Sequence, residues 1–183
     1  SMVEAATPTR AEASDVATAV YQGADAVMLS AESAVGRHPQ SAVAIMDRII
    51  RAVEDDNEYW ASLPRDMTPP QATTADAIAL SARHIADVIN CAALVAYTAT
   101  GSTAIRVARE RPRVGVIGLT PFLNTARKLT LVWGVRAMVT EDAQNVEDMV
   151  DKADAAVRKL GVAGAGDRVA IILPQRPETG IAH

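Results

Sequence analysis

The chain has 183 residues, of which 49% are hydrophobic and 3% aromatic, and its formal net charge is −4 at pH 7. This length suits one domain of ordinary size with an appendage, and the core should consist mainly of Ala, Val, Ile and Leu side chains. The negative net charge gives no support to binding of nucleic acid or of an anionic membrane surface.

The single cysteine, Cys91, excludes an internal disulfide and suits a reducing cytoplasm. It lies in the apolar run 91–96 without a base nearby in the sequence, which favours a buried structural thiol over a nucleophile. No apolar run approaches the roughly 20 residues that span a bilayer, and the N-terminus lacks the pattern of a signal peptide. We therefore expect neither a membrane segment nor a secretion signal.

Helix and strand signals alternate in the first 55 residues. Thr9 followed by Glu12 is the pattern of a capping box, and it predicts a helix that ends at Gly23. The apolar run 26–29 predicts a short buried strand. Residues 41–55 predict an amphipathic helix with its hydrophobic side chains on one face.

Residues 56–72 have the composition of a linker, since Pro64, Pro69 and Pro70 interrupt any helix. Beyond it, short apolar runs alternate with helical patterns. The expected strands are 93–97, 114–119, 135–139 and 169–173, and the expected helices are 73–88, 103–111, 124–132 and 146–160. Strands separated by helices predict an α/β fold with a mostly parallel sheet and helices on both of its faces.

Two stretches near the start of the chain carry a long, position-specific pattern. They read PTRAEASDVA over residues 8–17 and GADAVMLSAESAVG over residues 23–36. This pattern resembles the end of the catalytic (β/α)8 barrel of the pyruvate kinase family. The match is collinear over both stretches, which makes it a specific signal.

The second half of the chain resembles the C-terminal domain of the same family. The matching segments are RVARERP (106–112), IGLTP (117–121), NTAR (124–127) and WGV (133–135), in the family's order and spacing. The resemblance implies a remnant of the catalytic barrel over residues 1–55, a linker over 56–72, and the regulatory and assembly domain over 73–183. We therefore expect a pyruvate kinase C-terminal fold preceded by the end of a barrel.

The resemblance also implies an activity for the parent enzyme, which transfers a phosphoryl group from phosphoenolpyruvate to ADP in glycolysis with Mg²⁺ and K⁺ as cofactors. In the family this chemistry uses a lysine, acidic metal ligands and a threonine that precede the part of the barrel matched here. None of them has a counterpart in residues 1–183. We therefore expect this chain alone to be inactive, with no catalytic residue and no metal site of its own.

Ser30, Glu32 and Ser33 follow the predicted strand of the barrel end, on the face where barrel active sites form. In the family this loop borders the nucleotide pocket, so the three residues are candidates for a place near the nucleotide. The sequence departs from the family at Ala31, Ser33 and Val35, where glycine, threonine and lysine are usual. The alternative is that Ser30 and Glu32 only hold the loop through its hydrogen bonds.

A hydroxyl-rich turn, residues 98–103, joins a predicted strand to a predicted helix. The N–H groups at a helix N-terminus favour an anion, and hydroxyls add donors. In the family the equivalent loop binds the phosphate of a sugar-phosphate effector; Ala99 and Ser102 stand where some members have a lysine and an arginine, and Arg106 lies one turn further on. The candidate effector-binding residues are Thr98, Thr100, Gly101, Ser102 and Thr103. The alternative is an ordinary helix cap.

We interpret the chain as the C-terminal part of a bacterial-type, cytoplasmic pyruvate kinase that serves effector binding and subunit assembly. Its expected partners are a phosphorylated metabolite, the remainder of the kinase barrel and further copies of the chain. The alternative is a free-standing α/β module that senses a phosphorylated metabolite, although such a module has no reason to retain one and a half barrel units. A purely structural role in joining subunits is a third reading.

Overall fold

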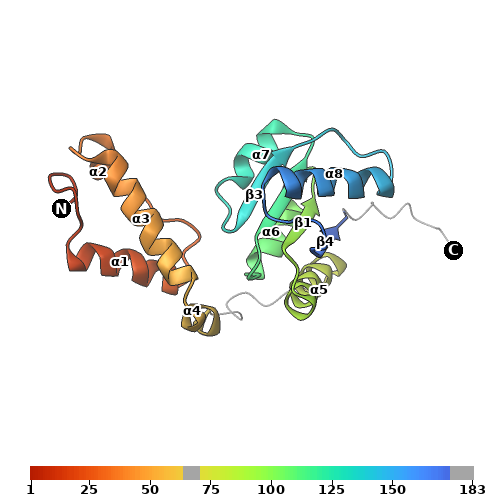
Figure 1. The fold of residues 1–183 in the computed structure, drawn as a ribbon, viewed down its shortest axis with the longest axis horizontal. Coiled ribbons are helices and arrows are strands. Elements are labelled where there is room, and N and C mark those ends of the chain that lie inside the picture. The colour runs from red at the N-terminus through yellow and green to blue at the C-terminus, as the bar shows by residue number, and fades with distance from the viewer. Residues whose placement is uncertain (64–70, 174–183) are drawn as a thin grey trace. The chain divides into compact units, whose positions relative to one another are not determined.

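The computed structural model describes residues 1–63 and 71–173. The chain divides into two compact units, Ser1–Met67 and Thr68–His183. Figure 1 shows the elements of both units along the chain. Within the described ranges, no helix is both long and apolar enough to cross a membrane.

The described part of the first unit is helical. Its helices are α1 (Arg10–Tyr21), α2 (Ala31–Ala34), α3 (Pro39–Glu54) and α4 (Asn57–Ser62). Helix α1 begins with the predicted capping box, in which the Glu12 N–H donates to the Thr9 hydroxyl and the Thr9 N–H donates to the Glu12 carboxylate at 2.8 Å. This exchange confirms the predicted start of the first helix.

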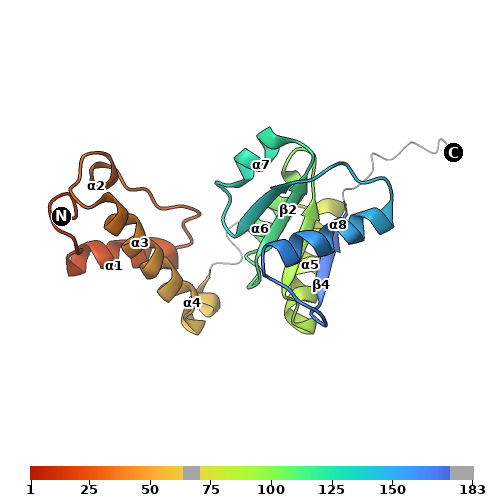
Figure 2. The same ribbon diagram turned by 45° about the horizontal axis from the view of Figure 1, so that its top comes forward.

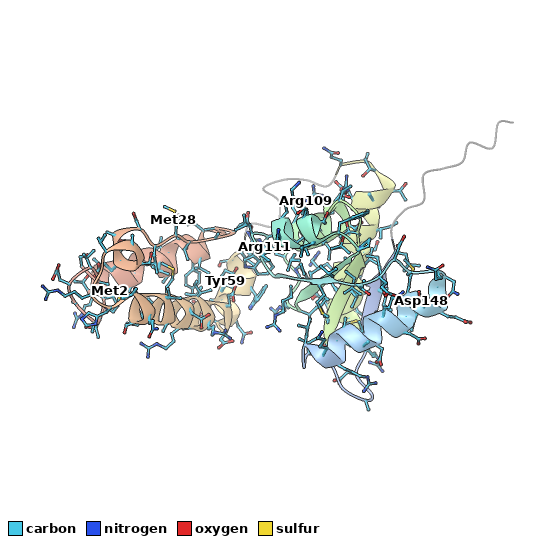
Figure 3. The ribbon with its side chains drawn as sticks, turned by 90° about the horizontal axis from the view of Figure 1, so that it is seen from above. Met2, Met28, Tyr59, Arg109, Arg111 and Asp148 are labelled. Carbon is cyan, nitrogen blue, oxygen red and sulfur yellow. The ribbon has the colours of Figure 1, made fainter. Side chains whose placement is uncertain are left out.

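The first unit has a small apolar core between α1, α3 and α4. Its buried members are Val20, Val53, Tyr59 and Leu63. The Tyr59 ring, labelled in Figure 3, meets the Tyr21 ring edge-on with centroids 5.9 Å apart. The Tyr21 hydroxyl donates to the Asp56 carboxylate at 2.6 Å, and this bond lies at the N-terminus of α4. Helix α4 is therefore packed into the first unit rather than standing apart from it.

Helix α4 lies inside the segment 56–72 that the sequence analysis placed in a linker. Asp56 caps this helix by accepting a hydrogen bond from the Glu58 N–H, and the Tyr59 side chain is completely buried. Burial of a whole aromatic side chain stabilises the short helix far more than the propensities of its residues do. Residues 64–70 of the expected linker, with its three prolines, lie outside the described residues.

The predicted strand at 26–29 is wrong, because this run has no regular secondary structure. The Met28 side chain is 86% exposed and projects away from the ribbon in Figure 3. A strand persists only when its N–H and C=O groups pair with a neighbour, and the described residues 1–63 contain no other strand. The apolar run therefore lies on the surface in place of the buried strand that its composition predicts.

The second unit is a four-stranded parallel sheet covered by helices. Its elements are α5 (Thr74–Ile89), β1 (Ala93–Tyr97), α6 (Ser102–Arg109), β2 (Val116–Thr120), α7 (Leu123–Leu129), β3 (Val135–Val139), α8 (Val146–Lys159) and β4 (Val169–Ile172). The strand order is β3-β2-β1-β4, and every neighbouring pair is parallel. Leu94 of β1 lies opposite Val116 of β2 and Ala170 of β4. The predicted α/β fold is confirmed, with element ends that differ from the predicted ones by a few residues.

Helices cover both faces of this sheet, as predicted; α8 lies on one face, and α5, α6 and α7 lie on the other (Figure 2). The side chains of β1 alternate accordingly: Leu94 and Ala96 pack toward α5, α6 and α7, while Val95 and Tyr97 pack toward α8. Cys91 is 5% exposed and lies in the core between the sheet and α5, α6 and α7, which agrees with the predicted buried thiol. The core is mainly small aliphatic, as the composition predicts.

Candidate phosphate-binding site

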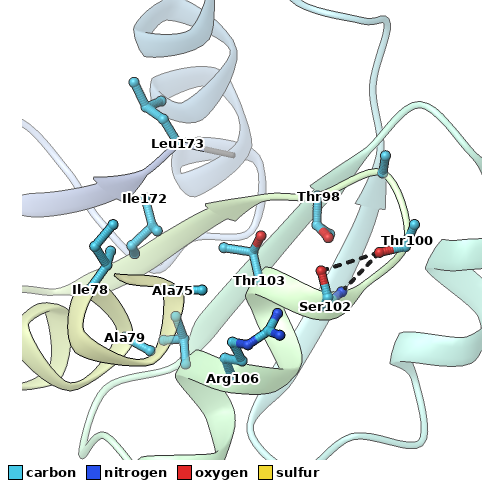
Figure 4. A pocket seen from close by; sticks show the side chains of 12 residues that line it. Ala75, Ile78, Ala79, Thr98, Thr100, Ser102, Thr103, Arg106, Ile172 and Leu173 are labelled. Carbon is cyan, nitrogen blue, oxygen red and sulfur yellow. Dashed lines mark hydrogen bonds between the residues drawn. The ribbon is translucent and has the colours of Figure 1, made fainter. Parts of the chain in front are cut away.

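A pocket of about 330 Å³ opens beyond the carboxyl ends of β1 and β4 (Figure 4). The chain passes from β1 to β2 and β3 on one side, and then returns to β4 on the other side of β1. Open parallel sheets bind ligands where the strand order reverses in this way. The lining residues are Ala75, Ile78, Ala79, Thr98, Ala99, Thr100, Ser102, Thr103, Arg106, Val107, Ile172 and Leu173.

The structure brings the predicted effector-binding turn to this pocket. Thr98, Thr100, Ser102 and Thr103 all line it, and the buried Gly101 is the N-cap residue of α6. The first N–H groups of a helix have no partner within the helix. Here the Ser102 N–H reaches the Thr100 hydroxyl at 3.5 Å, while the dipole of α6 still favours an anion at this end. The arrangement has the elements of an anion site.

Gly101 has a backbone conformation that other residues adopt only under strain. Its φ is +97°, in the left-handed region, and a Cβ placed on it would lie 3.3 Å from the Leu129 side chain. Glycine at this position therefore lets the backbone turn sharply from β1 into α6. A side chain here would disturb the turn as well as any ligand.

The hydroxyl groups of the turn have unequal roles. The Thr98 oxygen is buried and accepts a hydrogen bond from the Gly101 N–H at 2.9 Å, so it holds the turn. The Thr100 hydroxyl donates to the Ser102 hydroxyl at 3.2 Å and accepts from the Ser102 N–H at 3.5 Å, as the two dashed lines in Figure 4 mark. All four hydroxyls were predicted to be donors to a ligand. In the structure, the hydroxyls of Thr98 and Thr100 instead form hydrogen bonds within the turn.

Helix α7 anchors the same turn from outside. The Thr125 hydroxyl donates to the Ala99 carbonyl oxygen at 2.8 Å, across 26 residues of sequence. Thr125 is 9% exposed while Ala99 lies at the surface, so this bond is partly shielded from water. Thr125 is not among the residues predicted from the sequence, because nothing in the local pattern links it to the turn.

An ion-pair network lies beside the pocket and joins α5 to α6. The buried Asp76 carboxylate accepts from Arg106 Nε at 3.0 Å, lies 2.8 Å from Arg109 Nη2, and accepts from the Gln71 N–H at 2.7 Å. The Asp76 N–H donates to the Thr73 hydroxyl, so Thr73 is the N-cap residue of α5, at the start of the predicted helix 73–88. Arg106, which the sequence suggested as the nearest cation, does line the pocket, but Asp76 already holds it.

The pKa of the Asp76 carboxyl is held below its usual range, chiefly by the hydrogen bond from Arg109 and next by that from the Gln71 N–H. Asp76 is therefore ionised at neutral pH. Because the pKa is lower in the folded state, the resulting stabilisation is fully present above the ordinary carboxyl pKa. It is lost as the pH falls through the lowered value.

The candidate residues of the barrel-end loop also lie together, within one turn. The Glu32 carboxylate accepts from the Ser30 N–H at 3.1 Å, and the Ser33 hydroxyl donates to the Ser30 carbonyl at 3.2 Å. A Cβ at Gly36 would collide with the Glu32 backbone, which explains the glycine. These bonds fit the reading in which Ser30 and Glu32 hold their own loop.

Among the described residues no three His, Cys, Asp or Glu side chains gather as a metal site would require.

Two family models match the chain. The model of the pyruvate kinase alpha/beta domain matches residues 76–180, and the model of the pyruvate kinase barrel domain matches residues 1–43. The chain belongs to the pyruvate kinase family. The two matches fall on the two stretches in which the sequence resembles this family, so the resemblance is confirmed.

Individual pyruvate kinases match over nearly the whole chain. The enzyme of Methylorubrum extorquens is 49% identical over 94% of this chain, and that of Corynebacterium glutamicum is 40% identical over 97%. A crystal structure of a pyruvate kinase from Cryptosporidium parvum covers 93% of this chain with a TM-score of 0.83 and 31% identity. This chain spans 36% of the length of each of the two bacterial relatives and 35% of the Cryptosporidium chain.

We predict that Thr125→Val lowers the free energy of unfolding by about 1 kcal/mol, because the hydrogen bond of the buried Thr125 hydroxyl to the Ala99 carbonyl is lost without a change of side-chain shape. Thr130→Val is the matched control, since the exposed Thr130 hydroxyl donates to the Arg127 carbonyl at 2.7 Å. It should cost less than half as much, because water replaces the lost bond. Urea denaturation of both variants measures the difference, and equal losses would contradict an anchoring role for Thr125.

Proposed function

We propose that this chain forms the effector-binding and subunit-assembly part of a bacterial-type pyruvate kinase, whose whole protein transfers a phosphoryl group from phosphoenolpyruvate to ADP in glycolysis. The observation that carries the proposal is the pocket at the N-terminus of α6, with the turn 98–103 as its rim. The proposed ligand is a phosphorylated metabolite whose phosphate occupies this turn. Thr98, Thr100, Gly101, Ser102 and Thr103 form the proposed site.

The geometry of the pocket supports an anionic group such as a phosphate over an uncharged ligand. The helix dipole at the first turn of α6 favours a compact anion. The hydroxyls of Thr100 and Ser102 are exposed at the rim, and the Ser102 hydroxyl, which accepts from Thr100, keeps its own proton for a phosphate oxygen. The opposite wall is apolar, with Ile78 and Leu173, and suits the carbon skeleton of the metabolite.

Exposed apolar side chains in both units support assembly with other chains. Ile85, Val88 and Ile89 share one face of α5 by their spacing and are 46%, 64% and 38% exposed. In the first unit, Met28 and Val35 are 86% and 78% exposed. The proposed partner of α5 is a second copy of the chain, and that of the first unit is the remainder of the kinase barrel.

The proposed parent reaction takes Mg²⁺ and K⁺ as cofactors, which would neutralise phosphate charge during transfer. In the described part of this chain the Glu32 carboxylate is bonded to its own loop, and a metal cluster is not formed. Ser30, Glu32 and Ser33 would therefore border the nucleotide rather than ligate metal.

The proposed location is the cytoplasm, where a buried free thiol such as Cys91 stays reduced.

We predict that the 183-residue chain alone does not produce pyruvate from phosphoenolpyruvate and ADP in the presence of Mg²⁺ and K⁺. The reason is that the lysine, acids and threonine assigned to this chemistry have no counterpart in its sequence. A coupled assay with lactate dehydrogenase and NADH measures the activity. Turnover that survives repurification of the chain would contradict the proposal.

We predict that inorganic phosphate and ribose 5-phosphate shift the amide resonances of residues 98–104 in an NMR titration. Ser102→Asp should weaken this binding by about tenfold or more, because it places a negative charge at the rim. This position is preferable to Gly101, where any side chain also strains the turn. Ser81→Asp is the matched control, since Ser81 is exposed on α5 outside the pocket lining.

Equal binding by the two aspartate variants would contradict the proposed site, and so would shifts centred elsewhere on the chain. Absence of any shift at millimolar ligand would leave the turn as an ordinary helix cap. In that case the structural role, in which the domain only joins subunits, would be the function that remains.

A further inference from the structure

Arg106 is the one charged residue among those that line the pocket in the described structure. Its guanidinium is 39% exposed and bonds through Nε to Asp76, whose side chain is 2% exposed. The Asp76 carboxylate therefore lies beside the pocket and is paired with Arg106, the cation to which an anionic ligand would bind. The carboxylate takes the Nε donor and sets a negative charge against that of the guanidinium, so a phosphate at the pocket meets a cation whose charge is already offset.

We propose that Asp76 is a positioning residue that keeps the pocket's affinity for phosphate low, because its carboxylate offsets the charge of Arg106 that an incoming anion would meet. The inference rests on the proposed phosphate-binding function of the turn 98–103. It concerns how strongly that site binds rather than where it lies.

The network around Asp76 is balanced in charge. Arg106 and Arg109 supply two positive charges, while Asp76 and Glu110, which lies 3.5 Å from Arg109 Nη2, supply two negative ones. A phosphate at the rim thus meets no net positive charge from these side chains. The turn itself adds none, since Ala99 and Ser102 are uncharged.

If Arg106 turns to a ligand, the Asp76 carboxylate still has other hydrogen-bond partners. The Asp76 carboxylate keeps Arg109 Nη2 at 2.8 Å and the Gln71 N–H at 2.7 Å, both on Oδ2. The lowered pKa of Asp76 means that protonation does not release Arg106 at neutral pH. Release therefore has to come from competition by the ligand or from loss of the carboxylate.

The test is Asp76→Asn in the full chain, titrated with inorganic phosphate at constant ionic strength and followed by the amide shifts of residues 98–104. The variant should bind phosphate about fivefold more tightly, as expected for one freed and partly exposed charge. A purely structural residue would instead weaken binding when altered. Asp154→Asn is the matched control: it removes the exposed carboxylate paired with Arg158 on α8, on the other face of the sheet, and should leave binding unchanged.

Arg106→Gln supplies a second measurement that does not depend on the folding of Asp76→Asn. In the otherwise unaltered chain it should change phosphate affinity by less than about twofold, because that charge is already engaged. In the double variant it should remove the gain produced by Asp76→Asn. A tenfold loss from Arg106→Gln alone would overturn the proposal.

The outcomes separate this inference from the proposed function. If the unaltered chain binds phosphate at residues 98–104 and a folded Asp76→Asn variant binds no more tightly, only the role of Asp76 is overturned. If neither protein binds phosphate there, the proposed function falls and this inference falls with it.

Discussion

The central place of β1 in the parallel sheet is the constraint on which the rest of the second unit depends. β1 pairs with β2 on one side and β4 on the other, and all five of its residues are buried. Because the chain leaves β1 toward β2 and re-enters the sheet beside β1 as β4, a space opens between the two carboxyl ends. The turn 98–103, the helix N-terminus and the pocket all occupy that space.

The shape of this pocket and its electrostatics make different contributions to the proposed function. The left-handed Gly101, the Thr98 hydroxyl and the bond from Thr125 fix the turn from which α6 begins, at the mouth of the pocket. The side chains around it supply hardly any net charge, since Asp76 engages Arg106. The backbone therefore provides the geometry of a phosphate site, while the side-chain network sets how strongly such a site attracts an anion.

The sequence predicts the second unit well, because each of its strands is a short apolar run and each pairs within the same unit. The local capping-box pattern of Thr9 and Glu12 also marks a helix start correctly. The first unit is less predictable: the run 26–29 has the composition of a strand but no partner, and α4 depends on burial of Tyr59, which is a tertiary effect. Asp76 and Arg106 are 30 positions apart in the sequence, and Thr125 and Ala99 are 26 positions apart. No local sequence pattern predicts either hydrogen bond.

The most direct test of this account is a crystal structure of the 183-residue chain soaked with selenate, a phosphate-like anion that anomalous scattering locates without ambiguity. The account predicts a selenate within hydrogen-bond distance of the backbone N–H groups at the start of α6, between the Thr100 and Ser102 hydroxyls. Selenate bound at other positions of the chain, with the pocket at the ends of β1 and β4 empty, would contradict it.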